Sequence, residues 1–135
     1  MKIERRSYRL PPATDPVERV SNAVKTVVAY YPPVDLRRMT GPSERFPALD
    51  FEAKLAGDVS PILFVDPQDP PTLIIHGDAD TLVPIASGQS IHDALKAANV
   101  ETQMLVIEGG DHGFRNPEHR VRATDAMVEW FTKHL

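Results

Sequence analysis

Cysteine is absent from the 135 residues of this chain. A protein without cysteine has neither disulfide bonds nor a metal site built on thiolates, and this composition fits a reducing compartment. A basic excess is also missing, because 15 Lys and Arg face 19 Asp and Glu and give a formal net charge of −4. The overall charge therefore gives no reason to expect nucleic acid as a partner.

Long apolar runs are missing as well, and none approaches the roughly 18 residues that a membrane-spanning helix needs. Residues 1–10 carry charge throughout, and no apolar stretch of the kind found in a secretory signal follows them. We therefore expect a cytoplasmic location and no contact with a membrane. Hydrophobic residues still make up 41% of the chain, which is enough for one folded domain with a buried core.

Three short apolar segments predict β-strands: residues 23–31, a run that begins at Thr72, and residues 102–107. The first two are rich in β-branched residues and almost continuously apolar, which is typical of strands buried on both faces of a parallel sheet. Pro32 and Pro33 end the first strand, and a glycine pair ends the third. We therefore expect about three strands in the chain.

Two helices are predicted by apolar residues that recur at helical spacing. The first begins after Pro84 and ends near Asn99, and the second runs from about Pro117 to His134. The side chains expected to face the sheet are Ile91, Ala94, Leu95 and Ala98 in the first helix, and Thr124, Val128, Phe131 and Leu135 in the second.

The order of these elements predicts an α/β fold in which parallel strands are joined by right-handed crossovers. We divide the chain into an N-terminal arm, residues 1–22, and one domain, residues 23–135. Residues 36–60 interrupt this domain as a surface excursion, for which the pattern predicts a short helix and no strand. Excursions of this length often form pocket walls or lids.

Polar residues follow the second and third predicted strands at the point where each strand ends. Asp78 and Asp80 come after the second strand, and Asp111 and His112 come after the third. The carboxyl ends of parallel strands meet at one edge of a sheet, where binding and catalytic groups collect. A single loop carboxylate is more often a turn former or a helix cap, and a strand histidine such as His76 is more often a packed structural residue. A metal site at these carboxylates is a further alternative, but no ligand pair at helical spacing supports it.

Two motifs carry a resemblance to a known family. The sequences HGDADTLVP, residues 76–84, and GGDHGF, residues 109–114, resemble the acid loop and the histidine loop of the α/β-hydrolase superfamily. Within it, they are most similar to the esterase group related to the catalytic domains of prolyl oligopeptidase and dienelactone hydrolase. The resemblance implies a three-layer α/β fold in which the strands of this chain are the last ones of the family's sheet. It also implies that Asp80 is the triad acid and His112 the general base.

The nucleophile that the resemblance requires is missing. The family carries a serine in a Gly-x-Ser-x-Gly elbow upstream of the first predicted strand, and no serine of this chain stands in that pattern. Ser90 matches part of this motif but lies inside the first predicted helix, so we treat the match as a coincidence. Ser43, in the excursion, is the one serine that we name as a weak candidate nucleophile. The chain therefore resembles the C-terminal half of such an enzyme, without a nucleophile or an oxyanion hole.

Two functions remain as predictions. The first is a hydrolase of small-molecule ester or related acyl bonds that uses Asp80 and His112 and needs no cofactor and no metal. The alternative is a non-catalytic, truncated hydrolase-fold domain with a role in oligomerisation or structure. In either case the strand of residues 23–31 lacks the neighbour that carries the nucleophile in the family, so we expect a homodimer through this edge.

Overall fold

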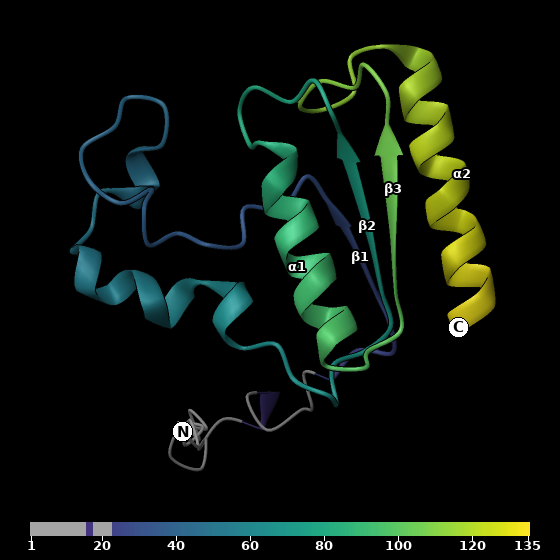
Figure 1. The fold of residues 1–135 in the computed structure, drawn as a ribbon, viewed down its shortest axis with the longest axis horizontal. Helices are drawn as coiled ribbons and strands as arrows, with labels where there is room; N and C mark the ends of the chain where they lie inside the picture. The colour runs from purple at the N-terminus through teal and green to yellow at the C-terminus, as the bar shows by residue number, and fades with distance from the viewer. Residues whose placement is uncertain (1–15, 18–22) are drawn as a thin grey trace.

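The computed structural model of the chain describes residues 16–17 and 23–135 (Figure 1). The predicted N-terminal arm, residues 1–22, therefore lies outside the described residues except at positions 16 and 17. The strands are β1 (Val27–Tyr30), β2 (Thr72–Gly77) and β3 (Thr102–Ile107), and the α-helices are α1 (Ile85–Ala97) and α2 (Pro117–His134). Between β1 and β2 lie the short 3-10 helices η2 (Pro47–Leu49), η3 (Ala53–Val59) and η4 (Pro61–Leu63).

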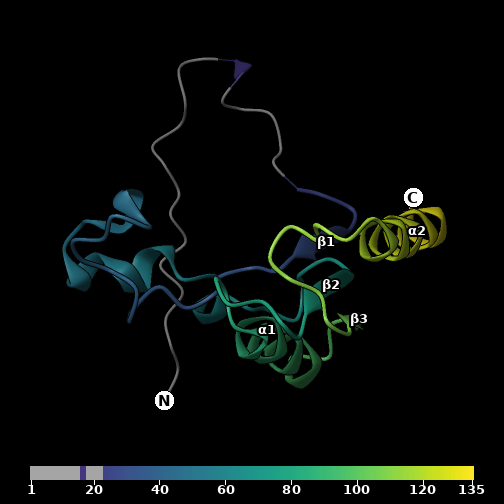
Figure 2. The ribbon, with the colours of Figure 1, turned by 90° about the horizontal axis from the view of Figure 1, so that it is seen from above.

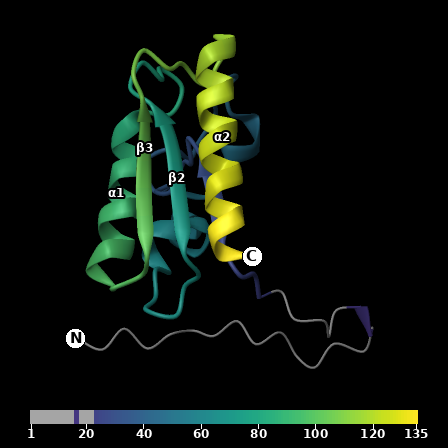
Figure 3. The same ribbon diagram turned by 90° about the vertical axis from the view of Figure 1, so that its right-hand side faces the viewer.

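The strands form one parallel sheet in the order β1, β2, β3. The first residues of the three strands are in register, since Thr72 pairs with Val27 on one side and with Thr102 on the other. Helix α1 covers one face of the sheet and α2 lies against the other (Figure 3). This three-layer arrangement of a parallel sheet and flanking helices confirms the predicted fold class.

Strand β2 is buried along its whole length and divides the core into two apolar layers. Leu73 and Ile75 pack with residues of β3 and α2, whereas Ile74 packs with Leu95 of α1. This alternation follows from the period of two along a strand, which sends successive side chains to opposite faces. The prediction that this strand is buried on both faces is confirmed. Since full burial of one such side chain contributes about 1.5–3 kcal/mol, β2 is the main anchor of the domain.

Strand β1 differs from its prediction in length and in burial. It covers Val27–Tyr30 rather than residues 23–31, and each of its residues is only partly buried. The prediction of an interior strand was wrong because β1 has a single neighbour, β2, among the described residues. The Thr26 hydroxyl donates to the Pro71 carbonyl over 2.7 Å and accepts the Trp130 indole N–H over 2.7 Å. These two bonds attach the beginning of β1 to β2 and α2.

Helix α1 faces the sheet with three of the four side chains that its spacing predicted, since Ala94 is not part of the apolar cluster on this side. Ile91, Leu95 and Ala98 all belong to the apolar layer on this side. The helix ends where Asn99 adopts a left-handed backbone conformation with a φ of 59°. The Val100 N–H then donates back to the Leu95 carbonyl over 3.0 Å, a bond that satisfies one of the last helical carbonyls and leads directly into β3.

Helix α2 uses a different stripe from the predicted one. Among the predicted positions only Phe131 packs against the core, and the three exposed ones are Thr124, Val128 and Leu135. The side chains that pack are Ala123, Ala126, Met127 and Trp130. Trp130 sets the rotation of the helix because its ring is buried and its N–H is bonded to Thr26. No helix of the described residues has the length and the apolar character that crossing a membrane requires.

The excursion over residues 36–60 contains short helices, of the 3-10 type, and no strand, as its pattern predicted. Figures 1 and 2 both show this segment to the side of α1, apart from the sheet. Its two ends are held together by the buried hydroxyl of Ser60, which donates to the Ala56 carbonyl over 2.6 Å and accepts the Leu36 N–H over 2.9 Å. The excursion therefore leaves and rejoins the domain at one place.

Candidate active site

Two loops, one after β2 and one after β3, touch each other at the carboxyl end of the sheet. A Cβ on Gly77 would lie 2.0 Å from the Gly110 carbonyl oxygen, so only glycine allows this approach. The Ala79 N–H donates to the same oxygen over 3.0 Å, and the Gly109 N–H donates to Oδ1 of Asp78 over 2.7 Å. Asp78 therefore joins the two loops, a structural role that differs from the turn former that its position in the sequence suggested.

Asp80 is held by the backbone of its own loop. Its Oδ1 accepts hydrogen bonds from the N–H groups of Leu82, over 2.9 Å, and Val83, over 2.8 Å. Its Oδ2 lies 2.8 Å from Nδ1 of His112, and the carboxylate is completely buried. Burial favours the neutral acid, but the hydrogen bonds from the two backbone N–H groups and the imidazole outweigh it and hold the pKa of Asp80 below its ordinary value. Asp80 is therefore a fixed, buried anion.

His112 stands on a short loop whose two ends are fixed. On one side the Asp111 carboxylate accepts the Arg115 backbone N–H over 2.9 Å and pairs with the Arg115 guanidinium. On the other side Phe114, with a left-handed φ of 47°, is buried in the core. A carboxylate can only accept, so Nδ1 of His112 carries the proton that Asp80 binds. Nε2 has no hydrogen-bond partner among the described residues, and the side chain is 30% exposed, so this nitrogen can exchange a proton with a bound molecule.

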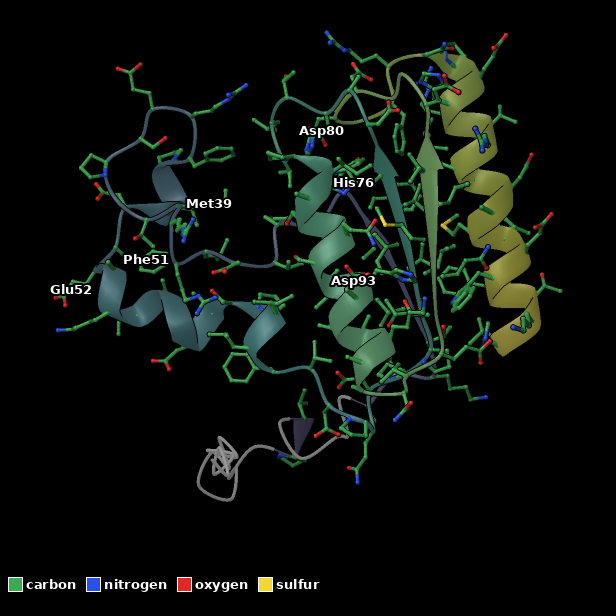
Figure 4. The ribbon with its side chains drawn as sticks, viewed as in Figure 1. Met39, Phe51, Glu52, His76, Asp80 and Asp93 are labelled. Carbon is green, nitrogen blue, oxygen red and sulfur yellow. The ribbon has the colours of Figure 1, made fainter. Side chains whose placement is uncertain are left out.

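A second histidine lies beneath Asp80. His76, near the end of β2, is fully buried, and its Nε2 donates to the Val83 carbonyl over 2.8 Å (Figure 4). The same nitrogen lies 3.5 Å from Oδ2 of Asp80. Helix α1 leaves room for the ring by placing Gly88 against it, since a Cβ there would lie 2.6 Å from Nδ1 of His76. His76 thus supports the acid loop from inside, in line with the structural role that its place in the strand indicated.

The structure brings Asp80 and His112 together but does not bring Ser43 to them. The Ser43 hydroxyl accepts the Phe46 N–H over 3.1 Å within the excursion. Figure 4 shows Met39 of the same excursion beside α1 and apart from Asp80, and Figure 2 shows the segment as a whole to the side of α1. Within residues 16–17 and 23–135, no group of His, Asp or Glu has the arrangement of a metal site.

Tyr31 is a site residue that the sequence did not reveal. Its ring centroid lies 4.2 Å from that of His112 and 5.5 Å from that of Phe114. The only signal in the sequence is its position at the end of the first predicted strand, before a proline pair, which predicts extended backbone and does not indicate where the side chain points.

The sequence profile of the prolyl oligopeptidase family matches residues 18–135. This chain belongs to the prolyl oligopeptidase family. Two of its relatives are a dipeptidyl-peptidase 5 from Porphyromonas endodontalis, 34% identical over 76 residues, and a putative carboxymethylenebutenolidase from Salmonella typhimurium, 30% identical over 100 residues. These alignments cover 56% and 64% of this chain, but only 11% and 37% of the relatives. The resemblance seen in the two loop motifs is thereby confirmed.

Solved structures with the same fold are esterases of the α/β-hydrolase type. An acetyl ester-xyloside bifunctional hydrolase from Caldicellulosiruptor lactoaceticus superposes with a TM-score of 0.75 at 23% identity. A truncated carbohydrate esterase from gut microbiota superposes with a TM-score of 0.68 at 28% identity. The superpositions cover 90% and 82% of this chain but 47% and 42% of those chains, so the chain spans under half the length of either esterase.

Proposed function

We propose that this chain supplies the acid and the base of a hydrolase site that acts on ester or related acyl bonds. The observation that carries the proposal is the 2.8 Å contact between Oδ2 of the buried Asp80 and Nδ1 of His112. A carboxylate in this position fixes the imidazole tautomer and stabilises the imidazolium that forms when Nε2 takes a proton. His112 is then the general base, and Asp80 is the group that orients it.

The proposed reaction has two proton transfers at His112. Nε2 removes the proton from a hydroxyl group or a water molecule as that oxygen attacks the acyl carbon. The leaving alcohol then takes the same proton from the imidazolium, and the acyl group remains on the attacking oxygen. Water is one candidate for this oxygen, because no serine of the chain stands in an elbow motif. Ser43 is the other, weak candidate, and the excursion that holds it would have to move toward His112.

Small-molecule esters are the substrate class that we propose. The solved structures of the same fold bear the names of esterases, and one family relative is named a putative carboxymethylenebutenolidase. An activated ester is also the easiest acyl compound for a site without a recognised oxyanion hole, because its electron-withdrawing leaving group makes the acyl carbon more reactive toward attack.

The test is hydrolysis of para-nitrophenyl acetate by the wild type, His112→Ala and the control His92→Ala. His92 lies on α1, where its Nδ1 contacts the Thr102 hydroxyl oxygen at 3.2 Å, so its removal leaves the site intact. Loss of a general base lowers the rate by about 10²-fold or more, and we expect this loss in His112→Ala alone. Equal rates in all three proteins would refute the proposal. Absence of activity in a folded wild type would favour the non-catalytic alternative.

A labelled phosphonate that reacts with activated serines identifies the attacking oxygen. We expect Ser43→Ala to abolish labelling if Ser43 is the attacking serine. His112-dependent hydrolysis without any labelled serine would assign the attack to water.

We also propose that β1 pairs with a second copy of the chain. The N–H groups of Val27 and Tyr31 donate toward β2 over 2.9 and 2.8 Å. Because successive N–H groups of a strand point to opposite sides, those of Val28 and Tyr30 face the edge where β1 has no neighbour among the described residues. Two such edges related by a two-fold axis would pair as antiparallel strands and cover each other's unpaired groups.

Amide hydrogen exchange at Val28 and Tyr30 tests this pairing. If the edge is covered by a second copy, protection of both amides should rise with protein concentration and follow dimer formation in sedimentation equilibrium. Protection that is independent of concentration would assign the cover to residues 1–22. Fast exchange at both amides in a folded monomer would rule out the proposed dimer.

A further inference from the structure

Tyr31, the first residue after β1, has a backbone conformation that residues other than glycine rarely adopt. Its φ is 38°, in the left-handed region that favours glycine, and such a conformation costs about 1–3 kcal/mol in a residue of this size. Two hydrogen bonds anchor the backbone on either side of it. The Tyr31 N–H donates to the Ile75 carbonyl over 2.8 Å, and the next residue, Pro32, accepts the Ser87 hydroxyl of α1 over 2.7 Å.

The strained turn changes the side of the sheet to which the ring points. In a regular strand, Tyr30 and Tyr31 would point to opposite faces. Tyr30 lies on the α2 side, where its hydroxyl donates to the Ala123 carbonyl over 3.1 Å. Tyr31 packs against the same apolar cluster as Tyr30, and their ring centroids are 6.0 Å apart. The left-handed turn therefore brings a second aromatic ring to the face that supports the histidine loop.

The ring of Tyr31 meets the imidazole of His112 with a centroid separation of 4.2 Å and an angle of 50°. It is held from behind by Phe114, whose ring lies 5.5 Å away at 71°. Asp80 binds His112 through one nitrogen only, and a single hydrogen bond leaves the imidazole free to rock about that contact. The Tyr31 ring blocks this rocking on one side of the imidazole.

We propose that Tyr31 is a positioning residue that fixes the plane of the His112 imidazole, so that Nε2 keeps one direction while Asp80 holds Nδ1. The role in catalysis rests on the proposed function, whereas the positioning itself does not. The phenol hydroxyl has no part in this role, since the contact with His112 is between the two rings. Glycine would adopt this positive φ without strain, but it has no ring to place against His112. The strained tyrosine is then retained because its ring is needed there.

The test compares Tyr31→Phe, which keeps the ring, with Tyr31→Asn, which tolerates a positive φ but removes the ring. The first measurement is NMR of His112 and does not depend on activity. The ring current of the nearby Tyr31 ring changes the chemical shifts of the carbon-bound imidazole protons, and a fixed imidazole gives a narrow signal for the Nδ1 proton bound to Asp80. We expect both features in the wild type and in Tyr31→Phe, and their loss in a folded Tyr31→Asn.

The second measurement is the rate of ester hydrolysis. A misplaced base lowers kcat with little change in KM, and we expect a loss of about 10- to 100-fold in Tyr31→Asn and none in Tyr31→Phe. Unchanged His112 signals in Tyr31→Asn would overturn the positioning role. Altered signals in a chain whose hydrolysis does not depend on His112 would support the positioning and refute the proposed function instead.

Discussion

Gly77→Ala is expected to destabilise the domain by more than about 3 kcal/mol, because the added methyl group meets only backbone. The new Cβ would lie 2.0 Å from the carbonyl oxygen of Gly110, 2.4 Å from its carbonyl carbon and 2.8 Å from its Cα. Backbone atoms cannot rotate away as a side chain can, so the two site loops must separate. Their separation breaks the bond from the Ala79 N–H to Gly110 and the bond from the Gly109 N–H to Asp78.

The same substitution should also remove the contact between Asp80 and His112, since each residue stands on one of the separated loops. Urea denaturation followed by circular dichroism measures the loss of stability, and the midpoint should fall without a change in slope. The matched control is Gly57→Ala in η3, where the new Cβ would make an ordinary contact of 3.8 Å with Leu63. This control should be neutral or slightly stabilising, by up to about 1 kcal/mol. A Gly77→Ala variant as stable as the control would mean that the loops are not packed this closely.

The buried centre of the domain and the two site loops were accessible from the sequence because their signals are local. Strand β2 is an apolar run that is buried on both faces, and its end is marked at once by Gly77 and by the acidic residues that follow. A parallel sheet then brings the end of β3 to the same edge, which is why Asp80 and His112 could be placed near each other before their contact was known.

The remaining features depend on contacts between distant parts of the chain. The rotation of α2 follows from the bond between Trp130 and Thr26, which are 104 positions apart, and no spacing within the helix indicates it. The partial burial of β1 depends on what lies beside it, which an apolar run does not reveal. Tyr31 reaches His112 through a left-handed turn that is fixed by Ile75 and α1, and a tyrosine before a proline predicts extended backbone instead.

Asp80→Asn is expected to lower His112-dependent hydrolysis by about 10³- to 10⁴-fold while the fold is retained. The amide that replaces the carboxylate would keep an oxygen for the N–H groups of Leu82 and Val83, but it would present N–H to Nδ1 of His112. Nδ1 must then accept, the proton moves to Nε2, and the nitrogen that should take a proton already carries one. A rate unchanged in Asp80→Asn, with His112→Ala inactive, would show that another group orients the imidazole.

The same variant should change how stability depends on pH. The pKa of Asp80 is lowered in the folded state from its ordinary 3.8, so the folded protein binds this proton less readily than the unfolded chain does. The stabilisation is therefore complete above about pH 4 and is lost as the pH falls through the folded-state pKa. Asn does not titrate, so the difference in free energy of unfolding between wild type and Asp80→Asn should shrink below pH 4.

The control is Asp35→Asn at an exposed carboxylate. The hydrogen bond from the Arg37 side chain lowers the pKa of Asp35 to about 2, so its titration falls in the same acidic range. Because this pair is open to solvent, its removal should change stability at pH 7 by no more than about 1 kcal/mol. Asp80→Asn should lower the free energy of unfolding by about 1–3 kcal/mol at the same pH. The reason is that two backbone N–H groups and an imidazole N–H would no longer bind a buried carboxylate. A pH-independent difference between wild type and Asp80→Asn from pH 7 to pH 2 would contradict a buried, ionised Asp80, and with it the assignment of this residue as the acid of the site.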